Sequence, residues 1–224
     1  QASAFKKISD AVQNRRAKPI LLEGVTGSGK TEVYLQSISQ VLNQGRTAIL
    51  MVPEISLTPL MVNRVRARFG DQVAVLHSAL SDGEKFDEWR RIMRNEVKVV
   101  VGARSAVFAP LHNLGIIIMD EEHSETYKQT DAPRYHARDV AIYRAQNANC
   151  PVVLGSATPA LESRARAERG VYDFIQIHKR ANQQALPAIR VIDMRRHLGD
   201  GFNENFSAPM VNAIQERVLK HEQV

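Results

Sequence analysis

The stretch LLEGVTGSGKTEVY, residues 21–34, decides the fold of this chain. Residues 24–31 of it, GVTGSGKT, match the pattern G-x-x-x-x-G-K-[S/T] at every fixed position. An apolar run that is typical of a buried strand precedes the pattern, and a helical pattern follows it. Glycines allow a tight turn whose backbone N–H groups point at phosphate oxygens, and the helix adds its positive N-terminal end. The stretch therefore predicts a loop that holds a nucleoside triphosphate.

The residues of this phosphate loop (24–31) have distinct expected roles. We expect Lys30 to reach the β- and γ-phosphates and the Thr31 hydroxyl to bind Mg²⁺. The predicted nucleotide-binding residues of the loop are Gly24, Val25, Thr26, Gly27, Ser28, Gly29, Lys30 and Thr31.

Composition limits the class of protein. The 224 residues are 44% hydrophobic and 24% charged, which predicts a folded chain with one sizeable core. No apolar run approaches the roughly 20 residues of a membrane span, so no membrane partner is expected. The single cysteine, Cys150, leaves no internal disulfide and no cysteine zinc site within these residues, and it fits a reducing cytoplasm. The net charge of +6 favours a polyanionic partner such as nucleic acid without requiring one.

Short apolar runs alternate with helical patterns over the first 170 residues. The runs are rich in Val and Ile without polar alternation, as strands buried on both faces are. Strand–helix alternation predicts an α/β domain, with a mainly parallel sheet and helices on both faces. The expected strands are residues 19–23, 47–52, 73–77, 97–102, 114–120 and 151–156. The expected helix faces include Leu57, Leu60, Met61 and Val65, and Phe86, Trp89 and Ile92.

The pattern weakens after residue 170. We expect a nucleotide-binding domain over residues 1–170, an edge extension with two strands over 171–198, and a linker over 199–206. Ser207 is placed to cap a helix with Pro209 in its first turn. The apolar face of that helix, in residues 207–224, is Val211, Ile214 and Val218.

The run IIIMDEEH, residues 116–123, ends an apolar strand in three acids and a histidine. We expect this strand to lie beside the strand before the phosphate loop, with Asp120 holding Mg²⁺ and Glu121 acting as the general base for water. The second acid argues against a small GTPase. A solvated acidic turn is the alternative. For His123, a polar cap after the strand is the simplest role.

Three further segments follow expected strands. In GSATPALES (155–163), Thr158 is a plausible N-cap with Pro159 at the first helical position. The segments VPEISLTP (52–59) and VGARSAVFAP (101–110) lie at carboxyl ends of strands, where ligands bind on such sheets. Their polar side chains are candidates for holding a sugar–phosphate backbone, and ordinary loops are the alternative. These candidates are Ser56, Thr58, Arg104 and Ser105.

Together, GVTGSGKTEVY, VPEISLTP, GARSAVFAP, DEEHSETYKQ, RYHARDVAIYRA and LGSATPALES resemble the bacterial primosomal replication-restart helicases, which belong to superfamily 2 and are of the DEAH type. The resemblance spans the whole chain. It implies a RecA-like P-loop NTPase lobe of an ATP-dependent, 3′→5′ DNA helicase in the bacterial cytoplasm. It implies ATP and Mg²⁺ as cofactors. The implied partners are single-stranded and forked DNA, replication-restart proteins and single-stranded DNA-binding protein.

The resemblance also assigns roles to individual residues. It implies that His123 relays the state of the γ-phosphate, and that Ser156 and Thr158 couple the ATP site to strand movement. Gln1 resembles the glutamine that recognises adenine, with Arg15 or Arg16 near the base.

The stretch from Tyr127 to Asp139 resembles an aromatic-rich loop that couples single-stranded DNA to hydrolysis. It carries Pro133 where relatives can have tryptophan. Tyr127 and Tyr135 are expected to stack on bases, unless they pack beneath the loop. Lys128, Arg134 and Arg138 are expected to contact phosphates.

Such motors have two lobes, and the second supplies an arginine finger. We expect this chain to be one excised lobe that binds nucleotide but hydrolyses it slowly. Residues 207–224 would begin the second lobe, and the zinc-binding cysteines of the family would lie elsewhere in the parent protein. The alternatives are another superfamily 2 translocase of the branch-migration or repair type, or a nucleotide-binding module without productive hydrolysis. An adenylate-type kinase is disfavoured because the chain shows no lid pattern.

Overall fold

The computed structural model describes residues 1–180, 189–194 and 206–223. The chain divides into two compact units, Gln1–Gln184 and Ala185–Val224.

The first unit is built on a seven-stranded sheet in which every pairing is parallel. The strand order is β3-β4-β2-β5-β8-β1-β9. The strands are β1 (Ile20–Gly24), β2 (Thr47–Met51), β3 (Val73–Leu76), β4 (Val99–Gly102), β5 (Leu114–Met119), β8 (Val152–Ser156) and β9 (Asp173–Ile177). A two-stranded antiparallel hairpin, β6 (Lys128–Gln129) with β7 (Tyr135–His136), lies outside this sheet. The predicted α/β class with a parallel sheet is confirmed.

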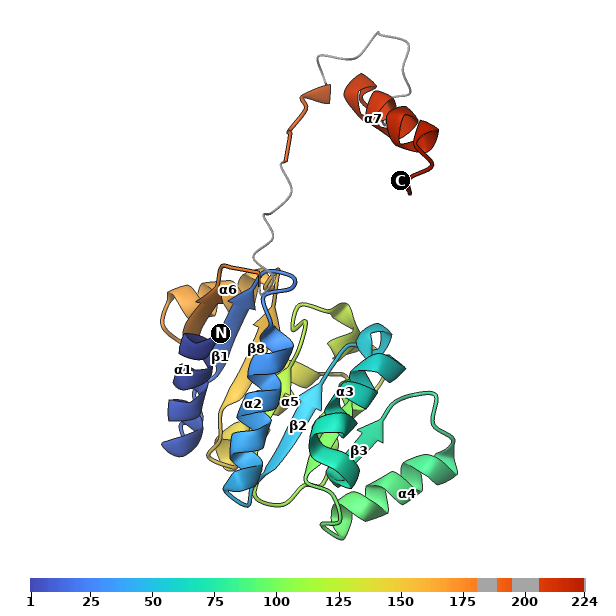
Figure 1. Ribbon diagram of the computed structural model, residues 1–224. Coiled ribbons are helices and arrows are strands. Elements are labelled where there is room, and N and C mark those ends of the chain that lie inside the picture. Colours follow the sequence, from blue (N-terminus) through green and yellow to red (C-terminus); the bar gives the residue numbers. More distant parts are fainter. Residues whose placement is uncertain (181–188, 195–205, 224) are drawn as a thin grey trace. The chain divides into compact units, whose positions relative to one another are not determined.

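Helices cover both faces of the sheet, and each face has its own core (Figure 1). One core packs under α1 (Ala2–Gln13), α2 (Lys30–Asn43) and α3 (Pro59–Phe69). The other packs under α5 (Ala137–Asn147), with contributions from α4 (Asp82–Met93) and α6 (Leu161–Glu168). Short 3₁₀ turns join these elements: η1 (Glu54–Ser56), η2 (Gly70–Gln72), η3 (Arg104–Phe108) and η4 (Glu125–Tyr127).

Successive strand residues point into opposite cores. In β1, Ile20 and Leu22 belong to the core under α1 and α2, whereas Leu21 belongs to the other core. Because both faces are covered, both sets of side chains must be apolar. This is why the strands appear in the sequence as unbroken apolar runs.

Local sequence signals set the starts of α3 and α4. The Thr58 hydroxyl accepts a hydrogen bond from Met61 N–H at 3.3 Å, with Pro59 opening α3. Ser81 and Glu84 form a complete capping box at the start of α4.

The predicted apolar faces of these two helices are only partly right. Leu60 is 80% exposed and Phe86 is 61% exposed, so both side chains face solvent. The buried members are Val65 and Phe69 in α3 and Ile92 in α4.

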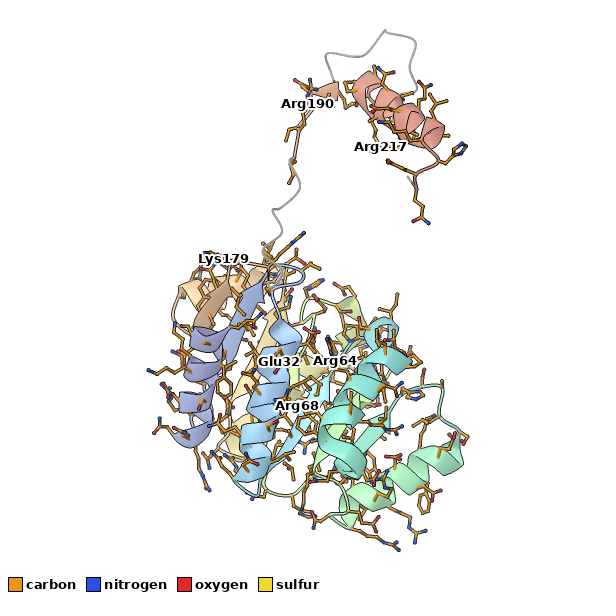
Figure 2. The ribbon with its side chains drawn as sticks, viewed as in Figure 1. Glu32, Arg64, Arg68, Lys179, Arg190 and Arg217 are labelled. Carbon is orange, nitrogen blue, oxygen red and sulfur yellow. The ribbon has the colours of Figure 1, made fainter. Side chains whose placement is uncertain are left out.

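One exposed ion pair joins two helices on the same face. Figure 2 shows Glu32 of α2 beside Arg68 of α3, and the Oε1 and Nη1 atoms are 3.0 Å apart. Arg68 also donates through Nε to the Ser39 hydroxyl at 3.4 Å. Exposed pairs of this kind contribute only about 0–1 kcal/mol, so apolar packing holds these helices together.

The region after residue 170 agrees with the sequence prediction in part. The first expected strand forms as β9 and pairs with β1 at the edge of the sheet. The second does not form over residues 189–194, which contain no strand. The proposed linker, apart from Phe206, lies outside the described residues.

The second unit contains α7 (Ala208–Leu219). The Ser207 hydroxyl accepts from Met210 N–H at 3.4 Å and a proline lies in the first turn, so the predicted cap is confirmed. None of the residues of α7 is buried.

No helix in the described ranges combines the length and the apolar character that crossing a membrane requires.

Candidate functional site

The phosphate loop leaves the carboxyl end of β1 and enters α2. Gly27 and Gly29 have φ angles of 76° and 85°, in the left-handed region that side chains disfavour. Their glycine identity is therefore required by the turn that the sequence pattern predicted. Gly29 is the N-cap of α2, so the last two residues of the phosphate loop, Lys30 and Thr31, are the first two of the helix.

Polar groups inside the loop fit a bound phosphate. Lys30 is 8% exposed, and its ammonium donates to the Gly24 carbonyl at 2.8 Å. The Ser28 hydroxyl is buried and has no hydrogen-bond partner in the described structure. A buried polar group without a partner is costly. A phosphate oxygen would accept a hydrogen bond from the Ser28 hydroxyl and a further one from the Lys30 ammonium. The Gln1 amide donates to the Ser28 carbonyl at 2.8 Å, which puts Gln1 against the loop.

Asp120 follows β5, but the predicted position of β5 is wrong. Strand β8 lies between β5 and β1, so Asp120 is not on a strand next to the phosphate loop. The helix after the phosphate loop, α2, contacts Asp120 instead, because the Tyr34 hydroxyl donates to Asp120 Oδ1 at 2.9 Å. Tyr34 crosses over Gly155 of β8, where an added Cβ would lie 1.7 Å from the Tyr34 hydroxyl. Because Gly155 has no side chain, Tyr34 of α2 can pass over β8 and reach the acidic end of β5.

Two buried tyrosines hold Asp120. Besides Tyr34, Tyr127 donates from its hydroxyl to the Asp120 carbonyl at 2.8 Å. Burial raises the pKa of the Asp120 carboxyl, and the negative charge of Glu121 adds to the rise. Hydrogen bonding from Tyr34 and the charge of Lys30 act in the opposite direction. The arrangement leaves a poorly solvated carboxylate whose charge a cation would stabilise.

Glu121 and His123 lie next to each other, and His123 also contacts Ser156 at the end of β8. Glu121 adopts a φ of 46°, and its Oε2 is 3.6 Å from His123 Nδ1. His123 Nδ1 is also 2.8 Å from the Ser156 hydroxyl, which accepts from Thr158 N–H at 2.9 Å. The contact brings together His123 and Ser156, to which the resemblance assigned separate roles in relaying the state of the ATP site.

Thr158 does not cap α6, contrary to the sequence prediction. The helix begins at Leu161, and its N-cap residue is Ala160. The Ala160 N–H donates to Glu122 Oε1 at 2.8 Å. A carboxylate from another segment therefore replaces the local cap.

Glu122 is a site residue that the sequence reasoning missed. It is 1% exposed, and Oε2 accepts from the Ser163 hydroxyl at 2.8 Å and lies 3.6 Å from Arg138 Nη1. Its N–H donates to the Gly155 carbonyl at 3.0 Å. The available signal was the third acid of the run, between Glu121 and His123, to which the sequence analysis assigned no role.

Two of the expected DNA contacts are contradicted by burial. Tyr127 is 0% exposed and packs beneath the loop, so it cannot stack on a base. The Arg138 side chain is 11% exposed and faces Glu122 and Ser163, so it is not available to a backbone phosphate. Both side chains are held by segments distant in the sequence, which local patterns do not reveal.

The other expected DNA contacts keep accessible groups. Tyr135 is half-buried against Phe108, with ring centroids 5.1 Å apart at an interplanar angle of 74°. Lys128 is exposed, and Arg104 donates to its carbonyl at 2.8 Å, which ties η3 to the β6–β7 hairpin. Accessible groups also remain on Ser56, Thr58, Ser105 and Arg134.

The donor set suits Mg²⁺ better than a metal that needs a protein cage. Among the described residues, no group of three or more His, Cys, Asp or Glu side chains could hold a metal ion. Magnesium in nucleotide sites takes one or two protein oxygens together with phosphates and waters. The Thr31 hydroxyl and the Asp120 carboxylate are hard oxygen donors of this kind. They therefore fit an ion that arrives with its nucleotide.

A family model for DEAD/DEAH box helicases matches residues 1–167. The chain belongs to the DEAD/DEAH box helicase family. The match covers six of the seven strands of the sheet, all except β9, and it includes the phosphate loop and the acidic strand end.

This helicase chain is similar to curated proteins named replication restart protein PriA. It is 56% identical over 223 residues to the protein of Bacillus subtilis, covering 100% of the chain and 28% of the relative. It is 47% identical over 209 residues to that of Synechocystis (91% and 25%) and 45% identical over 226 residues to that of Chlamydia pneumoniae (100% and 30%). The recognition of a replication-restart helicase from its motifs is confirmed. The chain spans less than a third of the length of these relatives.

Solved helicase structures share the fold. The helicase domain of Pyrococcus furiosus Hef aligns with a TM-score of 0.55 at 19% identity, covering 80% of this chain and 38% of that one. A structure of RecG bound to a three-way DNA junction aligns with a TM-score of 0.54 at 22% identity, covering 84% and 24%. The RecA-like architecture expected for the DEAD/DEAH helicase lobe is confirmed.

Proposed function

We propose that residues 1–170 form the ATP-binding lobe of a DNA helicase motor that restarts replication at stalled forks. The observation that carries the proposal is the connection from Tyr34 to Asp120 and from His123 to Ser156. It joins the phosphate loop, the acidic strand end and the loop after β8. A family in which ATP drives movement on nucleic acid needs such a connection.

The side chains divide the chemistry between them. Lys30 and the amides of the phosphate loop bind the triphosphate, and Gln1, which contacts the loop through its side-chain amide, is the proposed contact to the base. Thr31 and Asp120 would hold Mg²⁺, which supplies charge neutralisation on the phosphates when it is bound. Glu121 is 34% exposed in its side chain and accepts a proton from the attacking water. His123, paired with Ser156, reports the phosphate state to the loop after β8.

The DNA side of the proposal rests on the accessible groups around the β6–β7 hairpin. Lys128 and Arg134 supply positive charge, and Tyr135 offers a partly exposed ring. Positive charges that meet phosphates and a ring that stacks on bases are contacts that do not read sequence, so we expect binding to the sugar–phosphate backbone. Single-stranded and forked DNA, replication-restart proteins and single-stranded DNA-binding protein are the proposed partners. The proposed direction of movement is 3′→5′, and the proposed location is the bacterial cytoplasm.

The test compares three variants of the whole protein that carries this sequence. Lys30→Ala is expected to weaken binding of a fluorescent ADP analogue at least about tenfold, because it removes a buried phosphate contact. Glu121→Gln is expected to bind the analogue normally and to lose about 100-fold or more of its DNA-stimulated ATPase rate. Glu125→Gln, an exposed neighbour, is the control.

Two results would contradict the proposal. A Glu121→Gln variant that hydrolyses ATP at the parental rate would remove the general-base assignment. An unmodified protein whose ATPase rate does not respond to forked or single-stranded DNA would remove the DNA motor.

A further inference from the structure

Glu122 stands where three segments of the lobe meet. Its backbone lies between Glu121 and His123 at the acidic strand end. Its Oε1 accepts from Ala160 N–H at the start of α6, and its Oε2 faces Arg138 at the start of α5. The side chain has no exposed area, so each of these contacts is removed from solvent.

The pairing between Glu122 and Arg138 is electrostatically demanding. Burying a carboxylate is costly unless a charge and hydrogen bonds compensate it. Arg138 is the cation that faces Glu122, 3.6 Å away, and its Nη1 also donates to the Ser163 hydroxyl at 3.2 Å. Ser163 in turn donates to Glu122 at 2.8 Å, which closes a triangle of polar groups. If Arg138 moves away, the buried Glu122 carboxylate loses the cation that faces it and keeps only the hydrogen bonds from Ala160 and Ser163.

Arg138 lies two residues after the β6–β7 hairpin and is hydrogen-bonded to its last residue. His136 is the last residue of β7 and also the N-cap of α5, and its Nδ1 accepts from Arg138 N–H at 3.2 Å. A displacement of the hairpin therefore moves Arg138. The Arg138 Nε atom is buried without a hydrogen-bond partner and lies 3.6 Å from Oδ1 of Asp139, the next residue of α5.

We propose that Glu122 is a positioning residue that couples the hairpin of residues 128–136 to the ATP site through its ion pair with Arg138. This inference rests on the proposed function, because it assumes that the hairpin contacts DNA. A shift of the hairpin changes the Glu122–Arg138 distance, and the change acts on the neighbouring Glu121 and His123 and on the start of α6. The functional consequence is that DNA occupancy raises the rate of ATP hydrolysis.

The variants isolate the ion pair from the rest of the contact. Glu122→Gln keeps the side-chain volume and an oxygen for Ala160 N–H, but it removes the charge that Arg138 faces. Arg138→Gln leaves the Glu122 contacts to Ala160 and Ser163 in place. Glu125→Gln makes the same chemical change on an exposed acid nearby and serves as the matched control.

The ATPase rate of the whole protein is measured with and without saturating single-stranded DNA, together with the dissociation constant for an ADP analogue. We expect the ratio of DNA-stimulated to DNA-free rates to fall about tenfold in Glu122→Gln and in Arg138→Gln, a size typical of residues along a coupling network. The double variant should be no worse than either single variant, because both remove the same pair. Binding of the ADP analogue should change less than about twofold.

A second readout does not depend on turnover. Addition of single-stranded DNA should change amide hydrogen exchange over residues 160–163 in the unmodified protein, and this change should disappear in both variants. A structural role alone would alter exchange there without abolishing the response to DNA.

The outcomes separate this inference from the proposed function. Absence of DNA stimulation in the unmodified protein would remove the proposed function and the inference together. If DNA stimulates the unmodified protein and both variants equally, the inference alone is overturned. If Glu122→Gln does not fold, Arg138→Gln decides, and an unchanged stimulation ratio in that variant overturns the inference.

Discussion

At the scale of single residues, Asp120 is a buried carboxylate whose negative charge is poorly solvated. It lies between the hydroxyls of two buried tyrosines, and the like charge of Glu121 is next to it. Burial is the largest cause of its raised pKa. The folded protein therefore binds a proton at Asp120 more tightly than the unfolded chain does. A site of this kind is stabilised by a cation, which is how we interpret its place in the nucleotide site.

This charge predicts a pH-dependent effect of Asp120→Asn. Because the folded-state pKa is raised, the stability linked to this carboxyl is fully present below its ordinary value of 3.8 and is lost as pH rises through the raised pKa. The neutral amide avoids that loss. We expect Asp120→Asn to melt at a higher temperature than the unmodified chain near neutral pH without nucleotide, with the difference closing towards pH 3.8.

Thermal melts across a pH series check this expectation. Adding Mg²⁺ and ADP should reverse the order of melting temperatures, because only the unmodified carboxylate can stabilise the bound ion. A lower melting temperature for Asp120→Asn near neutral pH without nucleotide would contradict the assignment.

At the scale of elements, the site depends on α2 reaching past β8 to β5. Tyr34 is carried by the phosphate-loop helix, and Gly155 is the point in β8 over which its ring passes. The same strand ends in Ser156, which contacts His123. One glycine therefore connects the geometry of the nucleotide loop to that of the acidic strand end.

This crossing predicts that Gly155→Ala is destabilising. Its Cβ would lie 1.7 Å from the Tyr34 hydroxyl and 2.8 Å from Cζ, so the tyrosine must leave Asp120 or the strand must shift. We expect a loss of about 1–3 kcal/mol in the free energy of unfolding. Adding Tyr34→Phe removes the nearest atom and should recover part of that loss.

Urea denaturation of the two single variants and the double variant measures the coupling between these positions. Gly83→Ala, at a position outside the left-handed region where an added Cβ meets nothing within 4 Å, is the control for adding a methyl group without a clash. Strictly additive losses for Gly155→Ala and Tyr34→Phe would show that the two residues do not meet.

At the scale of the whole molecule, the sheet is covered by a buried core on each face. The single cysteine lies in one of these cores, so its reactivity measures how often the domain opens. Cys150 is 0% exposed and precedes β8. Burial raises the pKa of its thiol to about 11, against the weaker opposing charges of Arg46 and Arg144. The reactive thiolate is therefore scarce near neutral pH, and the sulfur is covered as well.

Alkylation of Cys150 is consequently expected to follow opening of the domain. Labelling by a maleimide should be slow in the native chain and fast in urea. Saturating ADP with Mg²⁺ should slow native labelling by about 100-fold when the ligand is at about 100 times its dissociation constant. Lys30→Ala should lose most of that protection. Mass spectrometry gives the rates, and rapid native labelling that nucleotide does not change would contradict the prediction.

Several features followed from the amino-acid order alone. The phosphate loop, the parallel α/β class, the capping of α7 by Ser207 and the membership of a helicase family were predictable. Each depends on residues close together in the chain or on a short pattern whose chemistry demands particular side chains. Gly27 and Gly29, for example, can be replaced by few residues at their φ angles.

Other features were decided only by the tertiary structure, because they depend on packing between distant segments. The insertion of β8 between β5 and β1 is a matter of strand order, which apolar runs do not encode. Tyr34 and Asp120 are 86 positions apart, and their hydrogen bond follows from that order. Burial turned Tyr127 from an expected stacking platform into a support for Asp120. It also turned Glu122 into the partner of Arg138 and Ala160, since a carboxylate removed from water must find its donors wherever the fold places them.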